Sequence, residues 1–96
     1  MVLGELDRQV GKAAYRRAGV RVYEGDSLSL LRRVSGAPVA LTVTSPPYNI
    51  GKEYERPRPL PEYLDWCEEW IRLVHAATRP DGAFWLNLGF SSPFRG

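Results

Sequence analysis

The stretch "VALTVTSPPYNIGKEYE", from Val39 to Glu55, joins a short apolar run to a pair of prolines. Its first five residues, Val39–Val43, form a nearly continuous apolar run, which is typical of a parallel strand covered on both faces. Two prolines follow the run, and Pro47 fixes its own φ and biases Pro46 toward extended backbone, so that the Pro46 carbonyl is aimed rather than mobile. The pair could simply end a strand in a solvated loop. It could also present a rigid set of polar and aromatic groups to a ligand.

Upstream of this stretch the sequence predicts a strand and a helix. Residues 1–19 carry a weak amphipathic pattern at helical spacing and form an N-terminal extension. The alternating, β-branched segment "VRVYEGD" predicts a strand over Val20–Glu24, which Gly25 ends. Either Asp26 or Ser27 is then suited to cap the next helix.

Downstream, a long amphipathic helix begins near Pro61, which suits the first turn of a helix. Arg79–Gly82 indicates a stop followed by a turn, and Ala83–Gly89 then predicts a third strand. Strands that alternate with helices favour a parallel sheet. We therefore expect an α/β fold, a partial doubly wound (Rossmann-like) parallel sheet of about three strands with flanking helices, over residues 20–96.

Length and composition exclude several classes of protein. A chain of 96 residues predicts one domain with a modest core, and 44% hydrophobic and 25% charged residues are ordinary for a globular protein. The single cysteine, Cys67, rules out a disulfide framework and fits a reducing, cytoplasmic location. We expect no membrane segment, because no apolar stretch approaches the ~20 residues that a membrane helix needs.

The charged residues offer one candidate site and exclude another. A net charge of +2 is too small to imply a polyanionic partner, but a local basic cluster, Lys52, Arg56 and Arg58, follows the proline pair directly. These three cations could meet phosphates, or they could belong to a solvated loop. His75 has no second metal ligand at a useful spacing, so we expect no metal site and interpret it as an ordinary helix-surface histidine.

The residues around the proline pair match one kind of ligand. In an open parallel sheet, ligands bind beyond the carboxyl ends of the strands, and Ser45 to Tyr48 sit at such an end. The Ser45 hydroxyl and the Pro46 carbonyl offer two acceptors, and Tyr48 offers a flat face for stacking. Together they suit a planar ring with an exocyclic NH2, although Tyr48 could instead anchor the loop on the sheet.

Three segments resemble one family, the DNA amino-methyltransferases. "TSPPY" at Thr44–Tyr48 is similar to their catalytic motif, written Asp/Asn/Ser-Pro-Pro-Tyr/Phe, and the Ser form is commonest in the enzymes that methylate N4 of cytosine. "VYEGDSLSLL" at Val22–Leu31 resembles the strand end whose acidic residue contacts the cofactor adenine. The segment Leu60–Gly89 resembles the helix and strand that follow the catalytic loop. The resemblance covers residues 20 to 90, and the spacing of the three segments makes it specific.

This resemblance implies a site and a reaction. Ser45, Pro46, Pro47 and Tyr48 would be the catalytic residues, which hold the amino group of a base flipped out of double-stranded DNA. The amino nitrogen would attack the methyl group of S-adenosylmethionine directly. Asp26 would accept from the adenine amino group of that cofactor, although a helix N-cap explains this residue equally well. Lys52, Arg56 and Arg58 would contact DNA phosphates. Cytosine N4 is the expected target, with adenine N6 as the alternative.

The sequence also departs from the family pattern. It has no glycine-rich loop of the Phe-x-Gly-x-Gly kind to cradle the cofactor, and it resembles the N-terminal third of the circularly permuted subgroup. It could thus be part of a restriction-modification methyltransferase that is active only with a missing C-terminal portion, or an inert remnant that acts at most as a binding fragment. In a sheet of order 3-2-1-4-5, Val20–Glu24 would be the outer strand. It could close against Val39–Val43, or both edges could stay open.

Overall fold

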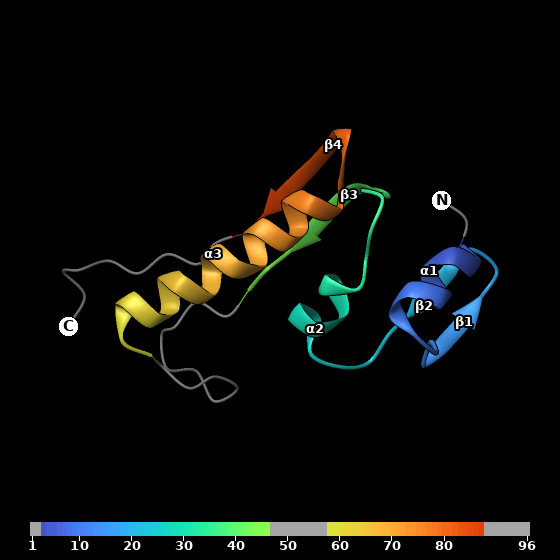
Figure 1. Ribbon diagram of the computed structural model, residues 1–96, viewed down its shortest axis with the longest axis horizontal. Coiled ribbons are helices and arrows are strands. Elements are labelled where there is room, and N and C mark those ends of the chain that lie inside the picture. The colour runs from blue at the N-terminus through green and yellow to red at the C-terminus, as the bar shows by residue number, and fades with distance from the viewer. Residues whose placement is uncertain (1–2, 47–57, 88–96) are drawn as a thin grey trace.

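The computed structural model of the protein describes residues 3–46 and 58–87. The described chain forms elements in this order (Figure 1): α1 (Leu3–Val10), β1 (Tyr15–Arg17), β2 (Val20–Val22), α2 (Ser27–Arg32), β3 (Val39–Thr44), α3 (Leu60–Ala77) and β4 (Thr78–Leu86). In Figure 1, α1, β1 and β2 gather at one end of the molecule, and α3 lies against β3 and β4. We call these two parts the N-terminal group (α1, β1, β2) and the helix-on-sheet group (β3, α3, β4).

The helix-on-sheet group confirms the α/β fold. β3 and β4 pair in parallel, with Val43 opposite Trp85, and the 18 residues of α3 connect them. Pro61 lies in the first turn of α3, as its fixed φ favours. One stripe of α3 is buried, and its largest member, Trp70, packs edge-on against Phe84 of β4 with ring centroids 6.1 Å apart. Aromatic packing therefore attaches the helix to one face of the sheet.

The other face of the sheet differs from the expectation for β3. A strand covered on both faces was predicted, but only the face that carries Thr42 and Thr44 lies beneath α3. Leu41, Val43 and Trp85 point away from it and are 55%, 70% and 69% exposed. Successive side chains of a strand point to opposite faces, so the apolar run places apolar side chains on both faces of the sheet. In the described residues, only one of these two faces is covered by a helix.

The beginning of β4 also differs from the prediction. The strand starts at Thr78 rather than Ala83, because the predicted turn at Arg79–Gly82 is contained in β4 as an irregularity in its register with β3. Gly82 permits this close approach. A Cβ atom built there would lie 2.7 Å from Thr78 Cγ2 and 2.9 Å from the Ala40 carbonyl oxygen, which is closer than real Cβ atoms come.

The N-terminal group corrects the prediction for the first strand. Val20–Val22 pairs antiparallel with Tyr15–Arg17 in a short hairpin, so it does not join the sheet of β3 and β4. That sheet therefore has two strands in the described residues instead of about three. The turn at Ala18 and Gly19 closes the hairpin, and Ala18 has a left-handed backbone with φ 46°. Alanine is not a residue that typically marks such turns, so the sequence gives little indication of this one. The division at residues 19 and 20 remains a prediction, although the hairpin joins residues on both sides of it.

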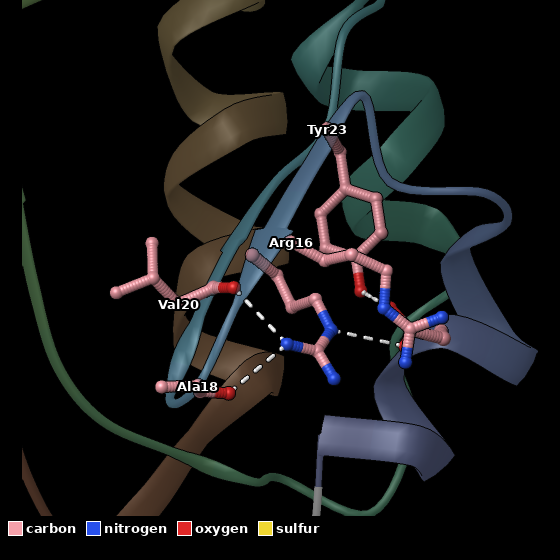
Figure 2. A network of polar contacts seen from close by, with 6 residues as sticks. Arg16, Ala18, Val20 and Tyr23 are labelled. Atoms are coloured by element: carbon pink, nitrogen blue, oxygen red, sulfur yellow. Dashed lines mark hydrogen bonds and ion pairs between the residues drawn. The ribbon is translucent and has the colours of Figure 1, made fainter.

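A carboxylate network holds α1 to this hairpin (Figure 2). Arg21 Nε donates to Asp7 Oδ2 at 3.0 Å, and the Tyr23 hydroxyl donates to Asp7 Oδ1. Arg21 Nη1 also donates to the backbone carbonyls of Ala18 (3.2 Å) and Val20 (3.0 Å). Hydrogen bonds to an ionised carboxylate are stronger than neutral ones, so this network fixes the helix on the strand pair.

The network shifts two pKa values in opposite directions. The hydrogen bonds from Tyr23 and then from Arg21 lower the pKa of Asp7 below its ordinary 3.8, because both favour the charged carboxylate. Partial removal from water and the bond to Asp7 raise the pKa of Tyr23 above its ordinary 10.0. Arg16 lies 3.8 Å from the same carboxylate and adds to its positive surroundings.

α2 lies between the two groups and contacts both. Arg33, at its end, donates through Nη1 to the Val10 carbonyl at 2.7 Å. Arg32 forms an ion pair with Glu69 of α3. Among the described residues, no helix has the length and hydrophobicity to cross a membrane.

Candidate active site at the carboxyl ends of the parallel strands

Ser45 and Pro46 follow β3 at its carboxyl end, where Ser45 is exposed and Pro46 is buried. Asn87 follows β4 at the same edge of the sheet, because parallel strands end together. The Asn87 backbone N–H donates to the Thr44 carbonyl at 3.0 Å, and its side-chain Nδ2 donates to Ser45 Oγ at 3.1 Å. The structure thus places a serine hydroxyl and a carboxamide side by side at the end where ligands bind in open parallel sheets.

Asn87 is the site residue that sequence reasoning missed. It stood inside the predicted strand Ala83–Gly89, where its neighbours are apolar. One available signal was its polarity in that run. The other was the parallel pairing itself, which predicts that residues following two adjacent strands meet at one edge. Its hydrogen bond holds Ser45 Oγ in place and occupies one of the two acceptor positions of that oxygen.

A cavity of about 260 Å³ extends from this strand end between α2, β3 and α3. Ser45 and Pro46 belong to its wall, together with Thr42 and Thr44 of β3. Apolar side chains of the two helices complete it, and these are Leu31, Trp66, Trp70, Val74 and Ala77. A mostly apolar cavity with a few polar groups at one end is a common form of ligand site.

Asp26 has a structural role that the geometry shows. It is the N-cap of α2, where its Oδ2 accepts from the Ser29 backbone N–H at 3.0 Å and from the Ser29 hydroxyl at 3.1 Å. The N-cap interpretation is therefore confirmed. Both bonds end on Oδ2, and the carboxylate is exposed. The next residue, Ser27, lines the cavity, whereas Asp26 itself does not.

One member of the predicted basic cluster is described. Arg58 precedes α3, and its guanidinium carbon lies 5.1 Å from the centre of the Trp66 ring, a cation–π contact. The same Trp66 borders the cavity, so this cation is held near it. Four predicted site residues lie outside the described residues: Pro47, Tyr48, Lys52 and Arg56.

The described residues also show where side chains with metal-binding chemistry lie. His75 is exposed on α3, in agreement with its interpretation as a surface histidine. In residues 3–46 and 58–87, no group of three or more His, Cys, Asp or Glu side chains converges on one point.

Comparisons with known proteins show the family of the chain. A family model described as DNA methylase matches residues 39–95, more than half of the chain. The chain is 50% identical over 88 residues to the type II methyltransferase M.ScaI of Streptomyces caespitosus, which is 92% of this chain and 29% of that protein. It is 41% identical over 69 residues to M.BglII of Bacillus subtilis, covering 72% of this chain and 19% of the relative.

A third relative, M.PvuII of Proteus hauseri, is 33% identical over 79 residues, which cover 81% of this chain and 24% of that protein. The chain therefore spans less than a third of the length of these three curated relatives. No solved structure gives a significant match.

Proposed function

The chain belongs to the DNA amino-methyltransferase family, and we propose that it supplies the catalytic strand end of an enzyme that methylates an exocyclic amino group in DNA. One observation carries the proposal. Ser45 and Pro46 follow a parallel strand at its carboxyl end, and the Asn87 amide holds the Ser45 oxygen from the neighbouring strand end at 3.1 Å. Since the chain spans 29% of M.ScaI, the activity is that of a larger catalytic domain.

The strand end is suited to hold an aromatic NH2 group. The hydrogen bond from Asn87 fills one acceptor position of Ser45 Oγ and leaves the second for a proton of the target amine. The Pro46 carbonyl would take the other proton. An aromatic amine is a poor nucleophile because its lone pair is delocalised into the ring. Two acceptors at fixed positions favour a pyramidal nitrogen, whose lone pair is then free to react.

One residue present, Asp26, suits the adenine end of S-adenosylmethionine, whereas the glycine-rich loop for the rest of that cofactor is absent from the sequence. The exposed Asp26 carboxylate, next in sequence to the cavity residue Ser27, would accept from the adenine amino group through Oδ1, since both bonds of its cap function use Oδ2. When bound, the cofactor supplies an electrophilic methyl carbon, whose bond to sulfur breaks as its bond to the base nitrogen forms. Ser45 and the Pro46 carbonyl would orient that nitrogen, and the proton it loses would pass from these acceptors to water.

DNA is the proposed partner, and the remaining predicted residues would contact it. Tyr48 would stack on the flipped base, and Lys52, Arg56 and Arg58 would meet phosphates. The contact with Trp66 supports this role for Arg58, because a guanidinium held over a ring needs less ordering to bind an anion. Cytosine N4 is the proposed target, since the Ser form of the motif, with Ser45 as its first residue, is commonest in the enzymes of this family that methylate N4 of cytosine. A cytoplasmic location agrees with the single cysteine.

A chimaera tests the proposal. The 88 residues that match M.ScaI would replace the corresponding segment of that methyltransferase, and methylated bases in digested DNA would be identified by mass spectrometry. We expect 4-methylcytosine. The Ser45→Ala variant should lower the methylation rate about tenfold or more, because a hydrogen bond to the reacting group is lost. Asn87→Ala should lower it less, since Ser45 keeps its hydroxyl.

Ser35→Ala is the matched control. Ser35 Oγ accepts a hydrogen bond from Gln9 Nε2 at 2.9 Å, so this variant also loses an amide-to-hydroxyl bond, but in the N-terminal region. Its rate should stay within about twofold of the unsubstituted chimaera. If 6-methyladenine is the only product, the N4 assignment is wrong. If the chimaera is inactive while intact M.ScaI methylates the same DNA, the inert-remnant alternative stands instead.

A further inference from the structure

The hairpin of β1 and β2 carries a local excess of positive charge. From Lys12 to Arg21 the sequence has four basic residues and no acidic one, although the whole chain has a net charge of only +2. Arg16 and Arg21 are directly opposite each other in the hairpin, an arrangement that is unfavourable for two like charges. Asp7 relieves this repulsion, since the two guanidinium groups lie 3.8 Å and 3.0 Å from its Oδ2 atom. One carboxylate of α1 therefore compensates for two cations.

The other two cations, Lys12 and Arg17, are both exposed. Neither takes part in the ion pairs of residues 3–46 and 58–87. The Arg16 side chain is also 67% exposed, despite its contact with Asp7. The hairpin region thus presents three solvated cations, the "hairpin cations" Lys12, Arg16 and Arg17, beside a single carboxylate that Arg21 already shares.

The face of the hairpin that points away from α1 also carries uncharged side chains. Directly opposite residues of an antiparallel pair share a face, and Tyr15 is paired with Val22 and Arg17 with Val20. The alternate residues contact Asp7 of α1, so these four side chains lie on the outer face. Tyr15, Val20 and Val22 are 49%, 53% and 48% exposed. A guanidinium and a phenol hydroxyl on one face are both donors to an anion, and the valines suit contact with the carbon atoms of a sugar.

The hairpin holds these groups in a fixed position. The carboxylate network joins it to α1, and Arg21 also binds the carbonyls of Ala18 and Val20 at the turn (Figure 2). The Ala14 backbone N–H donates to the Val22 carbonyl at 2.7 Å and extends the pairing by one residue. A backbone that is already ordered costs less conformational entropy when a ligand binds to it.

We propose that the hairpin cations and Tyr15 bind phosphate groups of the DNA duplex on which the candidate active site acts. The proposal rests on the proposed function, because that function brings DNA to the chain. In Figure 1 the hairpin lies at one end of the molecule and the start of α3 toward the other. The hairpin would therefore contact backbone that flanks the target base, apart from the predicted basic cluster before α3. Phosphate contacts add affinity and fix the position of a duplex without reading its sequence.

The salt dependence of DNA binding tests the proposal. A fluorescently labelled duplex of about 20 base pairs would be titrated with the full 96-residue chain at several KCl concentrations, with anisotropy as the readout. Each phosphate contact contributes about 0.9 to the slope of log K against log salt concentration. Arg17→Gln and Lys12→Gln should therefore each reduce that slope by about 0.9. Tyr15→Phe should weaken binding about two- to tenfold and leave the slope unchanged, because it removes a neutral hydrogen bond.

Arg72→Gln is the matched control. It removes the same charge from a side chain that is 78% exposed on α3 and paired with Glu68, so the slope should stay that of the parent chain. Circular dichroism would check that all variants keep the fold, as the exposure of the substituted side chains favours. Equal reduction of the slope by Arg72→Gln and Arg17→Gln would overturn the proposal, because it would be an effect of net charge alone. Absence of DNA binding by the parent chain would also overturn it, and so would binding of phosphatidylserine vesicles in place of the duplex.

The chimaera with M.ScaI separates this proposal from the proposed function. There Arg17→Gln should raise the KM for DNA and leave kcat within about twofold, since the hairpin touches no reacting atom. An inactive chimaera, with the expected salt slopes in the 96-residue chain, would keep the phosphate-binding surface and remove the function. An active chimaera whose KM and salt slope do not respond to Arg17→Gln would keep the function and remove the surface.

Discussion

In the N-terminal group a carboxylate joins the elements, whereas in the helix-on-sheet group an aromatic side chain does. Asp7 accepts from Arg21 and Tyr23, so both oxygens of this carboxylate have partners within the N-terminal group. Trp70 joins α3 to β4 through Phe84, but the sheet beneath it keeps one face and one edge without a partner in the described residues. The carboxylate of the N-terminal group has its partners within that group, whereas the helix-on-sheet group, which carries the candidate site, leaves apolar side chains of its sheet exposed.

The largest expected effect removes the aromatic contact. Trp70→Ala should lower the free energy of unfolding by about 3–5 kcal/mol, because a buried ring leaves a cavity and the contacts with Phe84 and Trp66 are lost. Chemical denaturation followed by circular dichroism would measure it. Ile71→Ala, at the neighbouring but 40% exposed position, is the control and should have a clearly smaller effect. Equal losses for both variants would show that α3 is not attached through Trp70.

A smaller effect is expected where β3 and β4 approach each other most closely. Gly82→Ala should lower the free energy of unfolding by about 1–3 kcal/mol, because the new Cβ would meet the Ala40 carbonyl oxygen at 2.9 Å. Gly4→Ala, in α1, has no atom within 4 Å of its new Cβ and should stabilise the chain by about 0.5–1 kcal/mol through helix propensity. Thermal melting of both variants should therefore give shifts of opposite sign. If Gly82→Ala leaves the melting temperature unchanged, the backbone at the irregularity of β4 can shift at little cost in free energy and the prediction is wrong.

The smallest effect concerns the carboxylate network and depends on pH. The folded state lowers the pKa of Asp7 below 3.8, so its contribution to stability is fully present above the unfolded pKa and is lost as the pH falls through the folded value. The Asp7→Asn variant should therefore melt at a lower temperature than the parent chain at neutral pH, and the difference should shrink below pH ~4.

Glu24→Gln controls for the general loss of one negative charge, because Glu24 is exposed and lies two residues beyond β2. Its melting temperature should follow that of the parent chain across the same range. A constant difference between Asp7→Asn and the parent at every pH would contradict the assignment of this network to the charged form of Asp7.

Local sequence patterns determined much of this protein. The apolar run of β3, the stripe of α3 with Pro61 in its first turn, and the Asp26 cap of α2 each depend on residues a few positions apart. The parallel pairing of β3 with β4 followed from the alternation of strands and helices along the chain. The position of Ser45 at the carboxyl end of a strand followed from these elements.

Contacts between residues far apart in the chain depend on how the elements pack together. Asn87 reaches Ser45 across 42 positions, Tyr23 reaches Asp7 across 16, and neither pair leaves a periodic trace in the sequence. The apolar run of β3 predicted two covered faces, because such a pattern records that side chains are apolar and not which neighbour buries them. Which face α3 covers depends on packing between elements far apart in the chain. That packing leaves Leu41, Val43 and Trp85 exposed.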